Sequence, residues 1–76
     1  MRLVTKTKEI EHRMTDLDLS QKELAKMMGH TPNTINNFIR GRNDSFKSAY
    51  RIAYYLGGTF EDYFDIDYSD EKQEVR

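Results

Sequence analysis

The sequence predicts a compact, all-α domain of five helices. The 76 residues contain only one Pro, so few positions forbid a helix. Glycines at positions 29, 41 and 57–58 each follow apolar residues at helical spacing, where a helix is expected to stop. Ser, Thr or Asp precedes most of these stretches and suits a helix N-cap. A chain this short has room for one domain, which we expect over residues 1–68.

The first helix is predicted from apolar spacing alone. We expect it to begin at Thr5 or Lys6 and to end at Asp16. Ile10 and Met14 are four residues apart and therefore lie on one face of this helix. The rest of the segment is mostly polar, as expected for a helix with one side in water.

The second helix is predicted from its cap. Ser20 is followed three residues later by Glu23, which is the capping-box pattern of a hydroxyl at the N-cap and a carboxylate at the third helical position. Gly29 is expected to end the helix. Its inward residues are expected to be Leu24, Met27 and Met28.

The third helix is expected to start at Thr31, with Pro32 at its first helical position, where the missing N–H has no partner to lose. Gly41 is expected to stop it. Its apolar stripe is Ile35, Phe38 and Ile39. These three residues recur at intervals of three and one, which places them on one side of the helix.

The last two helices are predicted in the same way. The fourth is expected to be capped by Asp44 or Ser45 and to run to Leu56, and the fifth to open at Thr59 with Asp62 in the capping-box position. The inward residues are expected to be Ala49, Ile52, Ala53 and Leu56 in the fourth helix, and Phe60, Tyr63 and Phe64 in the fifth.

The connection between the second and third helices is very short. Only Gly29 and His30 lie there, with Thr31 as the cap of the third helix. A turn of this length holds two helices at a steep angle to each other. The first helix of such a pair lies across the DNA backbone, and the second enters the major groove. The spacing therefore favours a helix-turn-helix.

The outward face of the third helix is polar and carries no acidic residue. Its members are Asn33, Thr34, Asn36, Asn37 and Arg40. Asn is a poor helix former, yet its amide both donates and accepts, which matches the N6 and N7 edge of adenine. This composition favours a helix that reads bases. The alternative interpretation is an ordinary polar surface helix.

Charge is unevenly distributed along the chain. Residues 1–51 carry ten Lys or Arg and six Asp or Glu, a net charge of +4, whereas residues 52–76 carry two and seven, a net charge of −5. DNA responds to the local field, so the overall charge of −1 does not exclude a nucleic acid partner. Residues 69–76 are acidic and poor in apolar side chains, and we expect a disordered tail there.

The segment from Leu19 to Gly29, with Thr31-Pro32-Asn33-Thr34-Ile35, Phe38-Ile39-Arg40-Gly41 and Ile52-Ala53-Tyr54-Tyr55-Leu56-Gly57 after it, resembles the Cro/C1-type (XRE) helix-turn-helix family. The likeness covers residues 6–64 without a gap. It implies a five-helix, lambda-repressor-like DNA-binding domain with the motif at the second and third helices.

The resemblance also implies roles for single residues. Those that match the base-reading positions are Asn33, Thr34 and Asn37. Those that match phosphate-contacting positions are Gln21, Thr31, Arg42, Asn43 and Lys47. On the outward face of the third helix, Asn36 and Arg40 are also expected to contact phosphate. In the family, the residue at the position of Gln21 also braces a reading side chain. Pro32 departs from the family pattern, because Pro cannot donate a hydrogen bond where relatives often have Gln.

Aromatic residues gather in the last two predicted helices. We expect a subunit or partner interface centred on Tyr54, Tyr55, Phe60 and Phe64, because these rings exceed what one inward stripe per helix requires. Pairs of subunits meet near this end in the family. The competing interpretation is that the rings only close the small core.

No pattern indicates an enzyme, a cofactor or a metal site. The chain has no Cys, its two His residues are far apart, and it lacks a Gly-rich phosphate loop. We expect a cytoplasmic phage or mobile-element repressor that binds duplex DNA as a homodimer and blocks transcription by occupying an operator. The alternatives are a protein that binds and modulates another regulator, and an accessory factor that bends DNA in recombination.

Overall fold

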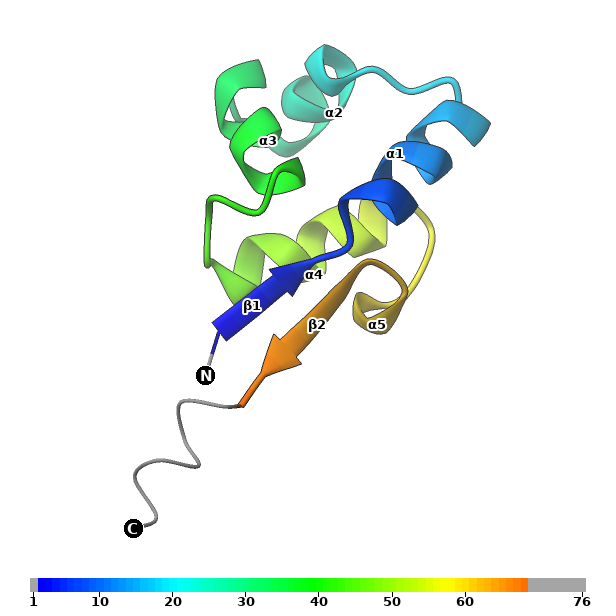
Figure 1. Ribbon diagram of the computed structural model, residues 1–76. Helices are drawn as coiled ribbons and strands as arrows, with labels where there is room; N and C mark the ends of the chain where they lie inside the picture. Colours follow the sequence, from blue (N-terminus) through cyan, green and yellow to red (C-terminus); the bar gives the residue numbers. More distant parts are fainter. Residues whose placement is uncertain (1, 69–76) are drawn as a thin grey trace, which may run out of the picture.

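The computed structural model describes residues 2–68, and these residues form five helices and one two-stranded sheet (Figure 1). The strands are β1 (Arg2–Thr5) and β2 (Phe64–Asp67). The helices are α1 (Thr7–Asp16), α2 (Gln21–Met28), α3 (Pro32–Ile39), α4 (Phe46–Tyr55) and α5 (Phe60–Tyr63). The tail predicted for residues 69–76 lies outside the described residues.

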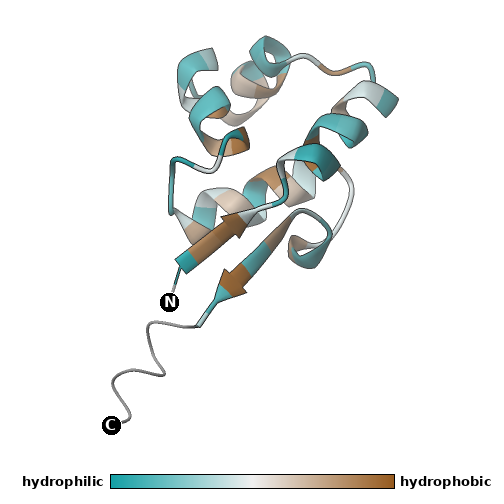
Figure 2. Cartoon of the chain, viewed as in Figure 1, coloured by the Kyte–Doolittle hydropathy of each residue, from teal (hydrophilic) through white to brown (hydrophobic). Residues whose placement is uncertain are grey.

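The all-α prediction is wrong at both ends of this range. β1 pairs antiparallel with β2, with Leu3 opposite Ile66 and Thr5 opposite Phe64. We call this two-stranded sheet the ribbon. Leu3 is 8% exposed and Phe64 is 1% exposed, so one face of the ribbon completes the core. Consequently α1 begins two residues later than the earliest predicted start, and Phe64, expected in the fifth helix, is already extended. Figure 2 shows apolar residues on both strands.

The helix ends confirm most of the predicted caps. Ser20 and Glu23 form the complete capping box of α2, and the hydroxyls of Thr31 and Ser45 accept from backbone N–H groups of α3 and α4. Ser45, not Asp44, is therefore the cap of α4. Each of α2, α3 and α4 is followed within two residues by a glycine with positive φ, at positions 29, 41 and 57. This agreement follows because caps are local signals.

The core takes side chains from every helix and from both strands. Its fully buried large members are Ile10, Leu24, Ile35, Phe38, Ile39, Ile52, Leu56 and Phe64. In α2 Ala25 is buried at 1% exposure, whereas Met27, which the sequence pattern places inward, is 49% exposed. The helix is rotated so that Leu24, Ala25 and Met28 face the core.

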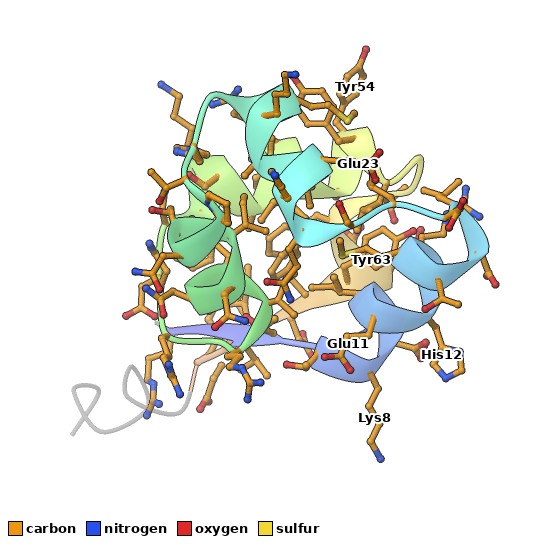
Figure 3. The ribbon with its side chains drawn as sticks, turned by 90° about the horizontal axis from the view of Figure 1, so that it is seen from above. Lys8, Glu11, His12, Glu23, Tyr54 and Tyr63 are labelled. Atoms are coloured by element: carbon orange, nitrogen blue, oxygen red, sulfur yellow. The ribbon has the colours of Figure 1, made fainter. Side chains whose placement is uncertain are left out.

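The helices α2 and α3 lie together at one end of the molecule, and the ribbon and α5 lie at the other (Figure 1). The loop after α3 returns along the molecule to the start of α4, close to β1. The outer surface of α1 is polar, and Lys8, Glu11 and His12 project from it into solvent (Figure 3). The pair α2 and α3 is thus presented at one end of a small, closed core.

Candidate nucleic-acid interface

The turn between α2 and α3 has the short geometry that the sequence predicts. Gly29 has φ 75°, and the backbone N–H of His30 donates to the carbonyl of Ala25 at 2.8 Å. A left-handed residue at this point reverses the chain, and Gly adopts that conformation without the steric cost of a Cβ atom. Thr31 then caps α3, accepting from the N–H of Thr34 at 3.2 Å. Three residues therefore separate the two helices.

The helix α3 buries one face and exposes the other. Ile35, Phe38 and Ile39 are at most 2% exposed and fix the helix against the core. On the opposite face Asn33 and Arg40 are exposed, and Thr34, Asn36 and Asn37 are half-buried. The structure thus places the three predicted base-reading residues, Asn33, Thr34 and Asn37, on the outward side of this helix.

Gln21 and Asn36 are brought together across the motif. The Nδ2 of Asn36 donates to the Oε1 of Gln21 at 3.2 Å, and both side chains are half-buried. This bond joins the first residue of α2 to the middle of α3. A Gln side chain has two amide hydrogens, so Gln21 keeps donors for another partner while it holds Asn36.

The threonines at the start of α3 are also paired. The hydroxyls of Thr31 and Thr34 lie 3.0 Å apart in a hydrogen bond. Each hydroxyl therefore has a protein partner, and the Thr34 methyl group is the part of that side chain suited to an apolar contact with thymine. Thr31 is exposed at the N-terminal end of α3, where the backbone N–H groups and the helix dipole favour an anion.

The segment that follows α3 supplies cations. Arg40, Arg42 and Lys47 are exposed. Asn43, by contrast, is half-buried and its Oδ1 accepts from the backbone N–H of Ser45 at 3.0 Å, so it shapes the loop. Of the residues predicted to contact phosphate, Thr31 and the three cations are exposed in the described protein, whereas Gln21, Asn36 and Asn43 are partly engaged within it.

Two side chains that sequence reasoning missed hold the ends of the motif helices. The hydroxyl of Thr7 donates to the carbonyl oxygen of Ile39, the last residue of α3, at 2.6 Å. The guanidinium of Arg51 donates to the carbonyl oxygen of Met28, the last residue of α2, at 3.2 Å. Neither residue has a sequence signal for this role, because the contacts join segments far apart in the chain.

The predicted aromatic interface divides into two parts. Phe60 and Phe64 are 7% and 1% exposed and stack on each other with ring centroids 5.5 Å apart. They serve the core of their own chain and do not face outward. Tyr54 is 78% exposed and meets the half-buried Tyr55 edge to face at 5.6 Å. Figure 3 shows Tyr54 pointing away from the protein.

The capping box of α2 lowers the pKa of the carboxyl group that takes part in it. The backbone N–H of Ser20 donates to Glu23 at 2.9 Å, and this bond and the Ser20 hydroxyl hold the pKa of Glu23 below its ordinary value of 4.5.

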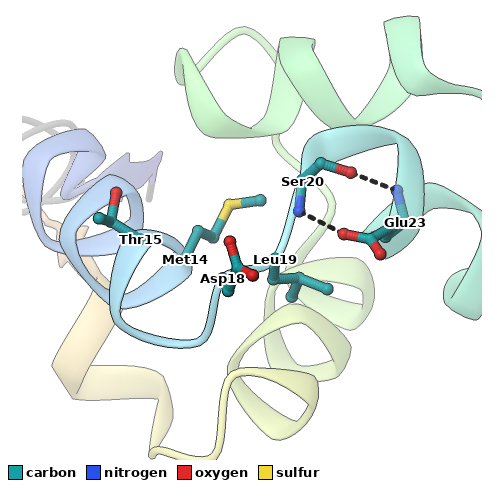
Figure 4. A pocket seen from close by; sticks show the side chains of 6 residues that line it. All are labelled: Met14, Thr15, Asp18, Leu19, Ser20 and Glu23. Carbon is teal, nitrogen blue, oxygen red and sulfur yellow. Dashed lines mark hydrogen bonds between the residues drawn. The ribbon is translucent and has the colours of Figure 1, made fainter.

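A shallow hollow lies beside the capping box. It is lined by residues of α1, α2 and the segment between them, including Asp18 (Figure 4). Within residues 2–68, no group of three or more His, Cys, Asp or Glu is arranged to hold a metal ion.

Comparison with protein families finds that residues 10–63 match a family model described as helix-turn-helix. The match includes all of α2, α3, α4 and α5, and the two strands lie outside it. Comparison with curated proteins and with solved structures found no match. No helix in the described part of the chain is long and apolar enough to cross a membrane.

Proposed function

The chain belongs to the Cro/C1-type helix-turn-helix family of DNA-binding transcription regulators, and we propose that it represses transcription by occupying a specific operator. The family is regulatory and not typically enzymatic. The proposal extends to a cytoplasmic protein of a phage or mobile element, which blocks access of polymerase to the DNA that it covers.

One observation carries the proposal. The face of α3 that turns away from the core presents Asn33, Thr34 and Asn37. The exposed cations Arg40 and Arg42 follow α3 directly, and a third, Lys47, lies in the first turn of α4. Amide side chains distinguish bases in the major groove, and cations neutralise phosphates on either side. α3 contains no acidic residue to repel the DNA backbone.

We further propose that two copies bind one operator. Tyr54 is the most exposed of the large apolar side chains in residues 2–68, and Tyr suits an interface because its ring can be buried while its hydroxyl stays in water. Two copies related by a two-fold axis would read half-sites about one helical turn apart. The operator is therefore expected to be a two-fold symmetric sequence.

A second candidate function is supported by the same exposed rings. Tyr50 and Tyr54 are 58% and 78% exposed and four residues apart on α4, which suits docking of another regulatory protein. In that case the chain modulates a partner and binds DNA weakly by itself. An accessory factor that bends DNA would use the same α3 and would differ in the shape of the bound duplex.

The test is selection of duplexes from a random pool at low salt, followed by sequencing. The repressor proposal predicts enrichment of one symmetric sequence. The matched control is the variant Asn33→Ala/Asn37→Ala, which keeps the charge of the protein and is expected to enrich no sequence. A wild-type protein that enriches nothing would contradict the proposal and favour the protein-partner function.

A further inference from the structure

The N-terminal segment of the chain holds the far end of the reading helix. The hydroxyl of Thr7 donates to the carbonyl oxygen of Ile39 at 2.6 Å in a partly buried position. Beside it, Thr5 packs against Gly41, where an added Cβ atom would lie 3.5 Å from the Cβ of Thr5. Thr7 therefore contacts the last residue of α3, and Thr5 contacts the start of the loop that carries Arg42.

The end of α3 explains why this contact is needed. The N–H groups of Gly41 and Arg42 return to the carbonyls of Phe38 and Asn37 at 3.1 and 2.8 Å, the pattern of a helix that ends on a left-handed glycine. Within residues 2–68, no backbone N–H donates to the carbonyl of Ile39. A carbonyl left without a donor in a partly buried position costs stability, and Thr7 supplies the missing donor.

Thr7 is itself held firmly by the rest of the fold. It follows Lys6, whose backbone N–H donates to the carbonyl of Tyr63 at 2.9 Å and whose ammonium donates to the carbonyl of Glu61 at 2.9 Å. Before Lys6, Thr5 pairs with Phe64 in the ribbon. The position of Thr7 is thus set by α5 and β2. The hydrogen bond from Thr7 to Ile39 then fixes the end of α3 relative to these two elements.

We infer that Thr7 is a positioning residue for DNA recognition, which sets how the C-terminal half of α3 and the following loop meet the DNA. This inference rests on the proposed function. Gln21 holds the middle of α3 through Asn36, and Thr7 holds its end, so the helix is fixed at two points besides its apolar face. β1 and Thr7 precede the segment that matches the family model.

The two kinds of DNA contact respond differently to a small shift of α3. Hydrogen bonds to base edges require close alignment, whereas long cationic side chains adjust to phosphates over a wider range. Loss of the Thr7 bond therefore lowers the preference for the operator over random DNA more than it lowers binding to random DNA. A residue that only stabilises the fold would leave this ratio unchanged in the folded protein.

The experiment compares Thr7→Val, Thr7→Cys and Thr7→Ser. Val keeps the shape of Thr without the donor, Cys has a weak donor, and Ser keeps the hydroxyl. Affinity is measured for the selected operator and for a random duplex, at low temperature and with the folded fraction checked by circular dichroism. Thr7→Val is expected to lower the operator-to-random ratio by about five-fold, the factor that corresponds to the free energy of one typical hydrogen bond. Thr7→Cys is expected to give a ratio between those of Val and Ser, and Thr7→Ser a ratio near that of the wild type.

The matched control is Thr15→Val, because Thr15 also donates its hydroxyl to a carbonyl, that of Glu11 in its own helix at 3.0 Å, on the exposed side of α1. It is expected to leave the ratio unchanged. An unchanged ratio in Thr7→Val, or a ratio that does not fall in the order Ser, Cys, Val, would overturn this inference alone; if Thr7→Val does not fold, the Ser and Cys variants decide it. A wild-type protein without preference for any duplex would overturn the proposed function as well.

Discussion

The Nδ2 of Asn36 donates to the Oε1 of Gln21 at 3.2 Å, so the two helices of the motif are joined by a side-chain bond in addition to their apolar faces. The bond joins Gln21, the first residue of α2, to Asn36 in α3, the helix that also carries Asn33 and Asn37. A shift of either helix would stretch it. The contact of Gln21 with the DNA backbone and the reading of bases by α3 are therefore expected to depend on each other.

The first prediction concerns this coupling. Gln21→Ala and Asn36→Ala should each weaken binding to the operator, and the double variant should lose less than the sum, with a coupling of about 1 kcal/mol. The measurement is a double-mutant cycle on operator affinity. Additive losses would show that the two side chains contact DNA independently and that their mutual bond has no part in recognition.

The second prediction separates base contacts from phosphate contacts. Asn33→Ala and Asn37→Ala should each cost about 1–3 kcal/mol on the operator and little on random DNA, because a base-edge contact carries sequence information. Arg42→Ala should weaken binding to both and reduce the salt slope by about one. The affinities of the three variants for both duplexes check this. Equal losses on operator and random DNA for all three would rule out α3 as the reading helix.

The third prediction concerns the pH dependence of stability. Because the pKa of Glu23 is lower in the folded protein than its ordinary value of 4.5, the unfolded chain binds the proton more readily. The stabilisation is therefore complete above the unfolded pKa and is lost as pH falls through the folded pKa. Denaturant unfolding of the wild type and of Glu23→Gln should show a shallower loss of stability below about pH 5 in the variant.

Gln is the suitable replacement because it keeps an oxygen acceptor for the Ser20 N–H and cannot titrate. Parallel acid profiles of the two proteins would show that the capping carboxylate does not contribute. Ser20→Ala removes the reciprocal cap and should lower stability at neutral pH by about 1 kcal/mol.

The fourth prediction concerns assembly. Tyr54→Ser should leave the stability of the monomer within about 0.5 kcal/mol of the wild type, because the side chain is 78% exposed. It should also prevent two copies from pairing on the operator. Sedimentation with and without operator measures the assembly, and Tyr68→Ser, at an exposed tyrosine of another segment, is the control. A wild type that stays monomeric on its operator would contradict the dimer.

The helices are well predicted from the sequence because their signals are local. The capping box of Ser20 and Glu23, the cap at Thr31 and the stop at Gly29 each depend on residues a few positions apart. The outward face of α3 follows from helical spacing. Local sequence therefore suffices to place the turn and the reading helix.

The features that the sequence does not predict depend on contacts between distant segments. β1 is four residues long, and its partner lies at the other end of the described chain, so no local pattern marks the pairing. Pairing with β1 also ends α5 at Tyr63 and draws Phe64 into the core. The role of Thr7 depends on this ribbon, because the ribbon brings the start of α1 to the end of α3.

The most direct test of DNA recognition by α3 is the affinity of the wild-type protein for its selected operator and for random duplex over a series of salt concentrations. Both affinities should fall steeply as salt rises, because phosphate contacts release counterions. The ratio between them should stay at about 10³ or more, as base contacts require. A ratio near one at every salt concentration would contradict sequence-specific recognition, whatever the affinity.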